Sequence, residues 1–351
     1  MSAHAHRNCR RSKTLLIASL LVVATTAAIT AVDSYEFATP LFGLAVAPDG
    51  SLLVADAGAG IVELRKGVGT LIAELPGVTD IAPIGRGEMF AIRGGGPGLT
   101  TGSLFRVSRG STRLIADLYA FEAAANPHPA AIDSNPFDVE DLGDGVAVVA
   151  DAGGNDLLIV DDSGRVDWIA SFPNEVVPTA DIKHLLNCPA PPPGFERICT
   201  LPPTIPAQAV STSVAIGPDG AYYVGELKGF PAPIGKSRIW RVEPGARHAV
   251  CGSSDLCTVV ADGFTSIVDL TLGRDGTLYV TELDEATWAA VEFGRPLAGG
   301  TVNACDTSSW TCREIATGLT MPIATAVDRR GAIFVAINAL IPGAARIIAL
   351  Q

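Results

Sequence analysis

The segment from Ser211 to Val242, STSVAIGPDGAYYVGELKGFPAPIGKSRIWRV, decides the fold predicted for this chain. It contains an apolar run at 214–216, a tight Pro-Asp-Gly turn at 218–220, an alternating run after the turn and, beyond a Gly/Pro-rich loop, a third run. Apolar or alternating runs separated by turn residues are typical of antiparallel strands. The segment therefore predicts three consecutive antiparallel strands.

The same strand-turn-strand unit recurs along the chain. Its turn glycines are Gly50, Gly87, Gly145, Gly220, Gly276 and Gly331. The spacings between them, 37, 58, 75, 56 and 55 residues, leave room for four short strands per unit and for loops of varying length. Six such units predict an all-β fold, a six-bladed β-propeller over residues 33–351.

The two ends of the chain are expected to meet in the last blade. After Gly331 there is room for only two more strands, so this blade lacks its fourth strand. The segment 34–38, which precedes the first unit, is predicted to fill the gap. A ring closed in this way has no exposed sheet edge at the join.

The N-terminus has the pattern of an export signal. Four basic residues, Arg7, Arg10, Arg11 and Lys13, precede an uncharged apolar run over residues 15–32. This pattern is typical of a signal peptide, but the run is also at the lower length limit for a membrane-spanning helix. Residues 1–32 are therefore interpreted as a signal peptide or a retained anchor. The propeller is expected to be exported to the periplasm or the extracellular space, with membrane contact only through an uncleaved N-terminal segment.

The charge of the exported part disfavours one class of partner. Without the four N-terminal basic residues, 21 Lys and Arg face 37 Asp and Glu, a net charge of about −16. Such a surface repels phosphate backbones, so nucleic-acid binding is not expected.

Six of the seven cysteines fall in close pairs. The pairs are Cys188/Cys199, Cys251/Cys257 and Cys305/Cys312. Near neighbours beyond an export signal, without a CxxC motif or a histidine cluster, predict disulfides. The first pair lies in a Pro-rich insertion, residues 172–210, which is interpreted as a tethered loop.

The connections predict a working face. Because strands alternate in direction, the short Pro-Asp-Gly-type turns lie on one face and nearly all long connections on the other, where binding sites are usual. The candidate ligand or metal residues near the channel mouth on this long-loop face are Asn135, Asp138, Asp151, Glu226, Asp269 and Glu282. Their carboxylates and amide could ligate a hard cation such as Ca²⁺. Alternatively, each is hydrogen-bonded to the loop amides of its own blade.

Two segments carry a family resemblance. The sequence VSTSV at 210–214 with the following GPDGAYYVGELKGFPAPIGKSRIWRV, and Asn135-Pro136-Phe137 with VADAGGNDLLIVDDSG, resemble the ScyD/ScyE family, which is named for association with the biosynthesis of the pigment scytonemin. The resemblance extends over residues 42–350 and implies a six-bladed ring similar to NHL-type and lactonase-like propellers. It implies no catalytic residues.

The sequence is consistent with two functions. The first is an exported, non-catalytic binding or scaffold propeller that uses its long-loop face for a small molecule, a glycan or a protein. The second is a lactonase-like hydrolase in which a cation held at the channel mouth polarises a carbonyl. A quinone-dependent sugar dehydrogenase is a weaker third idea, because histidines that could act as a base are scarce.

Overall fold

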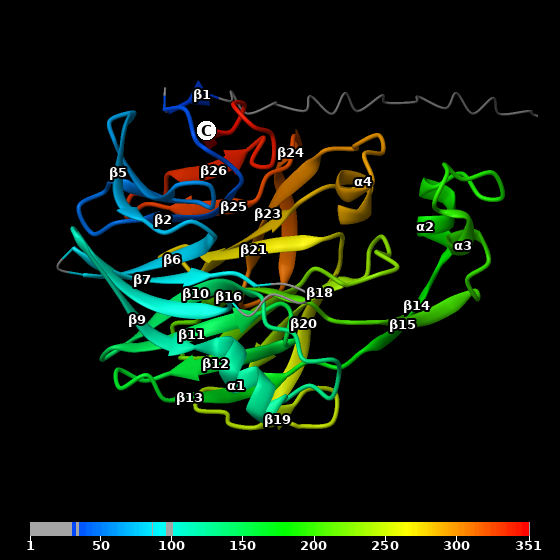
Figure 1. Ribbon diagram of the computed structural model, residues 1–351, viewed down its shortest axis with the longest axis horizontal. Coiled ribbons are helices and arrows are strands. Elements are labelled where there is room, and N and C mark those ends of the chain that lie inside the picture. Colours follow the sequence, from blue (N-terminus) through cyan, green and yellow to red (C-terminus); the bar gives the residue numbers. More distant parts are fainter. Residues whose placement is uncertain (1–29, 33–34, 86, 96–100, 351) are drawn as a thin grey trace, which may run out of the picture.

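The computed structural model describes residues 30–32, 35–85, 87–95 and 101–350, and these form a six-bladed β-propeller (Figure 1). Each blade is an antiparallel sheet whose first strand lies next to the central axis. The predicted fold class is confirmed, and so are the six repeat units.

The first three blades follow the repeat closely. Blade one comprises β2 (Leu41–Val46), β3 (Leu52–Asp56), β4 (Gly60–Arg65) and β5 (Val68–Glu74). Blade two comprises β6 (Val78–Gly85), β7 (Glu88–Arg93), β8 (Ser103–Ser108) and β9 (Ser111–Asp117), and the helix α1 (Leu118–Ala125) follows it. Blade three comprises β10 (Pro136–Gly143), β11 (Val146–Asp151), β12 (Asp156–Val160) and β13 (Val166–Ser171).

The other three blades contain the longer connections. Blade four comprises β16 (Ser211–Ile216), β17 (Tyr222–Glu226), β18 (Ser237–Val242) and β20 (Cys257–Phe264), with β19 (Ala249–Val250) crossing to pair with β13 of blade three. Blade five comprises β21 (Ile267–Leu272), β22 (Thr277–Glu282), β23 (Gly300–Asp306) and β24 (Thr311–Leu319), with α4 (Trp288–Glu292) between its second and third strands. Blade six comprises β25 (Ala324–Val327), β26 (Ile333–Ile337), β27 (Arg346–Leu350) and β1 (Thr30–Ala31).

The turn glycines explain why the repeat is visible in the sequence. All six have a positive φ, between +76° at Gly87 and +86° at Gly50. A side chain would strain this backbone conformation, and glycine adopts it freely. Each glycine therefore fixes the hairpin between the first two strands of its blade.

The ring closes through both termini, but the closing strand differs from the prediction. The outer strand of blade six is Thr30–Ala31, which pairs with Ala349 and Ile348 of β27. The predicted segment 34–38 was the wrong one, because its described residues lead into blade one. Phe37 is buried in the cluster between the last and first blades, and the Ala38 N–H donates to the Asp56 carboxylate at 2.6 Å. The closing strand thus lies inside the segment 1–32 that was interpreted as a signal or anchor.

The insertion at 172–210 is more ordered than the predicted tethered loop. Its strands β14 (Glu175–Pro178) and β15 (Thr204–Ala207) form a two-stranded ribbon that leads to the short helices α2 (Ala180–Leu185) and α3 (Glu196–Cys199). This unit, called the arm, stands at one side of the ring (Figure 1). Apolar contacts of Ile182 and Leu186 with Ala232 and Ala289 hold it against blade four and α4.

The three predicted disulfides are present. Cys188–Cys199 closes the arm, while Cys251–Cys257 and Cys305–Cys312 lie in the hairpins between the third and fourth strands of blades four and five. Three disulfides within one chain are typical of an oxidising, non-cytosolic compartment. Among the residues that the structure describes, none of the helices has the length and apolarity needed to cross a membrane.

The closing strand gives a first testable prediction. A protein that begins at Tyr35 lacks β1 and the Val32 N–H bond to the Ile347 carbonyl, whereas one that begins at Thr30 keeps them. Because each lost backbone bond costs about 0.5–1.5 kcal/mol, the shorter protein is expected to be less stable by about 2 kcal/mol. Calorimetry of the two proteins measures the difference, and equal melting temperatures would show that β1 does not close the ring.

Candidate functional site

The acids that end the second strands are held by backbone amides of their own blades. Asp151 Oδ1 accepts hydrogen bonds from the N–H groups of Asn135 at 2.7 Å and of Gly153 and Gly154 at 3.0 Å, and its Oδ2 accepts from Ser134 Oγ at 2.6 Å. In blade one, Asp56 does the same with the Ala38, Gly58 and Ala59 amides. These carboxylates therefore shape the loops that lead into their blades.

Glu282 and Asn135 also bind within the fold. Glu282 accepts the Thr265 N–H and the Asn303 side-chain amide, and burial raises its pKa to about 7. Asn135 Oδ1 accepts the Gly95 N–H at 3.0 Å, so it joins blade three to the β7–β8 connection. Neither side chain lines the channel cavity described below.

Glu226 lies in a buried ion cluster at the base of the arm. Its Oε2 is 2.6 Å from Nζ of Lys228 and 3.0 Å from Nε of Arg238, and its Oε1 accepts from Trp240 Nε1 at 2.6 Å. Glu226 and Lys228 are fully buried. Lys228 and Arg238 also pair with Glu175 of β14, so the cluster ties the arm to blade four.

The other predicted acids meet in the central channel. The position seven residues before each turn glycine is occupied by Gly43, Asp80, Asp138, Ser213, Asp269 and Ala324. The three aspartates line one cavity of about 160 Å³, and each accepts a backbone N–H of the following blade: Val139 at 3.0 Å, Val214 at 2.7 Å and Thr325 at 2.7 Å. Of the six predicted site residues, only Asp138 and Asp269 are brought together here.

Asp80, Asp138 and Asp269 are called the acidic layer, and the pKa values of all three are raised. Burial raises the pKa of Asp80 and of Asp269 well above the usual range, and the neighbouring Asp138 adds to both shifts. Burial raises the pKa of Asp138 to about 6, although a hydrogen bond from Asp80 lowers it in part. Glu140, two residues further along β10, also lines the cavity, and burial with the nearby Asp138 and Asp269 raises its pKa to about 8. The layer therefore favours protonated carboxyl groups.

An apolar layer separates these acids from the long-loop face. The position eight residues before each turn glycine, at the β-bulge of the first strand in blades one to five, is occupied by Phe42, Thr79, Phe137, Thr212, Val268 and Ile323. The Phe42 and Phe137 rings, from blades one and three, meet edge to face with centroids 5.7 Å apart. The cavity lining stops at the acidic layer and includes none of these residues. Asp80, Asp138 and Asp269 thus line a cavity on the short-turn side of this layer.

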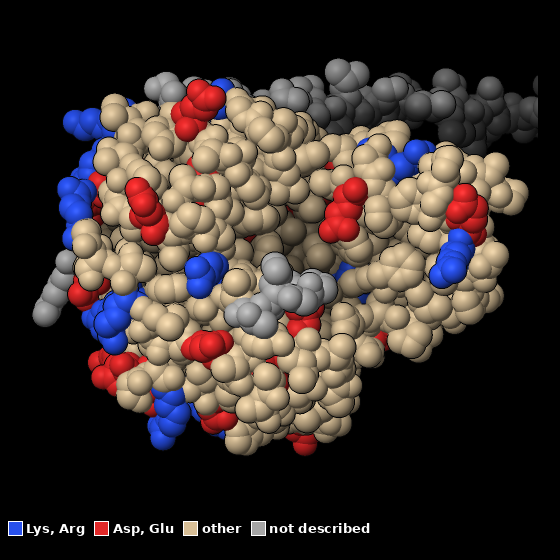
Figure 2. Space-filling view, in the orientation of Figure 1, with Lys and Arg blue, Asp and Glu red and all other residues tan. Residues whose placement is uncertain are grey.

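Apolar side chains remain partly exposed on the long-loop side of this layer. Five partly exposed side chains pack in the same hydrophobic cluster there: Phe42, Phe137, Leu227, Trp288 and Met321. Figure 2 shows a hollow near the centre of the face that carries the long connections, with mostly uncharged walls. The hollow and these five side chains are together called the central hollow.

A metal site needs several ligand side chains that converge on one point. Among residues 30–32, 35–85, 87–95 and 101–350, no group of three or more His, Cys, Asp or Glu side chains is arranged to hold a metal ion. The residues present thus do not fit the Ca²⁺ site suggested by the sequence. The carboxylates of Asp138, Asp151 and Asp269 accept backbone amides, Glu226 pairs with side chains of its own blade, and Glu282 accepts one amide of each kind.

Several functional residues escaped the sequence reasoning. The sequence patterns did not single out Glu140, Lys228 or the contact between Phe42 and Phe137. Counting back from the turn glycines would have found the apolar layer, because its members share one place in the repeat. The partners of Lys228 had no such signal, since Glu175 belongs to the insertion.

Comparisons with known proteins identify the fold. No family model matches the sequence, and no curated protein matches it. Solved structures of regucalcin, a calcium-binding protein from Agrobacterium tumefaciens, and of a gluconolactonase from Xanthomonas campestris are 14% and 12% identical, with TM-scores of 0.58 and 0.57. The match covers 93% of this chain and 94% and 90% of theirs.

A putative glucose dehydrogenase from Thermus thermophilus is also similar, at 17% identity and a TM-score of 0.56 over 93% of this chain and 100% of that one. The neighbours are propeller proteins with different reported activities. At these identities the likeness shows the fold alone, because one fold hosts many functions.

The acidic layer predicts a dependence of stability on pH. A carboxyl group whose pKa is higher in the folded than in the unfolded protein binds more protons when folded, so stability falls as pH rises from about 4.5 towards the folded pKa. The melting temperature is expected to be about 4 °C higher at pH 5.5 than at pH 8, and Glu140→Gln is expected to reduce this difference. Calorimetry across this range checks both, and an unchanged pH profile in the variant would contradict the assignment.

The buried ion cluster predicts a large mutational effect. Lys228→Met leaves the fully buried Glu226 without its closest cation, so the variant is expected to lose about 3 kcal/mol of unfolding free energy. The double variant Glu226→Gln with Lys228→Met removes both charges and is expected to recover most of the loss. Denaturant unfolding measures each value. If the double variant were no more stable than the single one, charge pairing would not be the cause.

Proposed function

We propose that this chain is an exported, non-catalytic binding propeller of the ScyD/ScyE type whose ligand binds in the central hollow of the long-loop face. The observation that carries the proposal is the floor of Phe42, Phe137 and Trp288. Partly exposed aromatic side chains in a concave site favour a ligand with a flat apolar surface. A small molecule with an aromatic ring, or the apolar face of a glycan, has this property.

The surroundings of the hollow support the same function. Large apolar side chains are exposed on the connections of this face: Ile132, Val176, Phe230, Ile234 and Leu297. The arm adds a wall beside the hollow. The ion cluster holds this wall in place, together with the contact between the Phe195 and Phe293 rings, whose centroids are 5.0 Å apart. A rigid wall limits the ordering cost of binding.

Export is part of the proposal. The basic N-terminus and the apolar run at 15–32 lie outside the described residues, apart from Thr30, Ala31 and Val32. Because Thr30–Ala31 closes the ring, a signal peptidase that leaves the propeller intact would cleave before Thr30. The three disulfides support an oxidising destination, periplasmic or extracellular.

Trp288 provides the test of binding. Uncharged aromatic compounds and aryl glycosides are titrated while tryptophan fluorescence is recorded, and a ligand in the hollow is expected to quench Trp288. Phe137→Ala is expected to weaken binding about tenfold, and Trp288→Phe is expected to remove the quenching. The control Trp310→Phe changes a tryptophan of the blade-five disulfide hairpin and should leave the affinity unchanged. Equal affinity in the Phe137 variant would rule out this site.

A hydrolase remains the second candidate because the cavity contains three closely placed carboxyl groups with raised pKa values. Such groups can serve as general acids or bases. Metal analysis of protein purified without chelator, together with a lactone panel, separates the two functions. Turnover that is lost in Asp138→Asn, while ligand binding in the hollow persists, would overturn the non-catalytic proposal.

A further inference from the structure

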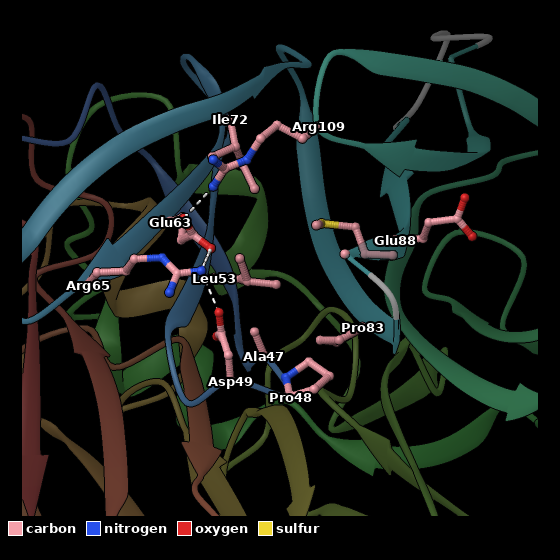
Figure 3. Close-up of a pocket in the computed structure, with 12 residues that line it drawn as sticks. Ala47, Pro48, Asp49, Leu53, Glu63, Arg65, Ile72, Pro83, Glu88 and Arg109 are labelled. Carbon is pink, nitrogen blue, oxygen red and sulfur yellow. Dashed lines mark hydrogen bonds and ion pairs between the residues drawn. The ribbon is translucent and has the colours of Figure 1, made fainter.

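A second cavity lies between blades one and two on the face opposite the central hollow. Its volume is about 370 Å³, within the range of small-molecule sites. The apolar part of its lining includes Leu53, Ile72, Pro83 and Met89. Figure 3 shows the charged side chains Asp49, Glu63 and Arg65 at one side of Leu53, with Arg109 reaching towards Glu63.

The internal repeat explains why this cavity exists. The position three residues after each turn glycine packs against the following blade and is occupied by Leu53, Phe90, Val148, Tyr223, Tyr279 and Phe334. Four of these six residues carry an aromatic ring. In blade one a leucine takes the place of the ring, and the space beside it is the cavity.

Blade four shows what fills the corresponding space. The Tyr223 ring lies against Gly217, whose added Cβ would be 3.2 Å from the ring, and Tyr279 lies against Gly273 in the same way. Ala47 stands at this place in blade one and lines the cavity. Blade one therefore differs from blades four and five by a matched pair of residues.

The polar groups of the two blades also correspond. In blade four, Asp219, Arg241 and Glu243 form an ion-pair trio beside Tyr223. Arg241 and Asp219 lie close enough to its hydroxyl to shift its pKa in opposite directions, while burial raises it.

Blade one contains the same three residue types. Asp49 corresponds to Asp219, but Glu63 stands at the position of Arg241 and Arg65 at that of Glu243. Arg65 pairs with Asp49 and, at 2.8 Å, with Glu63, which lies opposite Leu53 in the β3–β4 ladder. Blade one thus has the charged groups that surround the tyrosine hydroxyl in blade four, but it has no tyrosine.

Glu63 and Arg109 supply the groups that a phenol needs. The Glu63 side chain is 10% exposed, and the hydrogen bond from Arg65 lowers its pKa, so it is an ionised acceptor. Arg109 Nη2 is 2.9 Å from Glu63 Oε2, and its side chain is 74% exposed. Because the Arg109 side chain is mostly exposed, its pairing with Glu63 contributes little stability, and Arg109 can turn to donate a hydrogen bond to a ligand.

The geometry points to this cavity as a binding site for a small molecule with a phenolic ring, whose hydroxyl donates to Glu63 and accepts from Arg109. The ring takes the place that Tyr223 and Tyr279 take in their blades. The ligand is uncharged, because a carboxylate would meet Glu63 and Asp49. The site lies on the short-turn face, so it does not depend on the function proposed for the central hollow.

The probe is p-cresol, the side chain of tyrosine as a free molecule. In the full-length protein, p-cresol is expected to shift the methyl NMR signals of Leu53, Ile72 and Met89 with a Kd of about 1 mM. Toluene, which lacks the hydroxyl, is expected to bind about tenfold more weakly. Glu63→Gln should reduce the affinity for p-cresol about tenfold and leave that for toluene unchanged. No shift of these methyl groups at about 10 mM p-cresol, about ten times the expected Kd, would overturn the proposal.

Filling the cavity from within gives an independent test. The double variant Ala47→Gly with Leu53→Tyr reproduces the Gly217/Tyr223 pair, so it is expected to keep the wild-type melting temperature and to lose p-cresol binding. Ile72→Trp at the partly exposed rim is a second blocking variant, should the double variant not fold. Leu256→Ala, at an exposed position of the blade-four hairpin outside both sites, is the control and should keep the affinity within about twofold. Wild-type affinity in a folded blocking variant would place p-cresol elsewhere.

Discussion

The ring depends on carboxylates that reach from one blade to the next. Asp80, Asp138 and Asp269 each accept the backbone N–H of the following blade's innermost strand. Room for this contact is made in the sequence: a Cβ on Gly43 would lie 2.2 Å from Asp80 Oδ1. Because the acceptors are buried and close together, their pKa values rise. The bonds that join the blades thus also produce the most unusual electrostatic environment in the molecule.

The acidic layer and the central hollow are neighbours that do not communicate through an open channel. The Phe42–Phe137 contact and the aliphatic side chains of the same layer lie between them. A ligand on the long-loop face meets an apolar floor, and the acids belong to a cavity whose lining runs along the strands towards the short turns. The apolar layer therefore lies between these acids and a ligand on the long-loop face.

Departures from the six-fold repeat mark the places with chemical character. Glu140 stands where the other blades have small side chains or a threonine, and Leu53 stands where most blades have a ring. The arm interrupts the repeat between blades three and four and brings Glu175 to Lys228. Positions that follow the repeat form the common scaffold of the blades. Positions that depart from it are often functional sites.

The sequence by itself determined the repeat, the six blades and the disulfide pairs, because turn glycines, alternating strands and short cysteine spacings are local patterns. It also placed the ring join at the two termini, but it located the closing strand wrongly at 34–38, since both N-terminal segments can pair as strands. The side chains that meet in the channel, in the ion cluster and in the cavity beside Leu53 were decided only by the tertiary structure. In the channel and beside Leu53 the contacts join residues on different blades, and in the ion cluster they join blade four to the arm. The distances between these parts follow from how the whole chain folds.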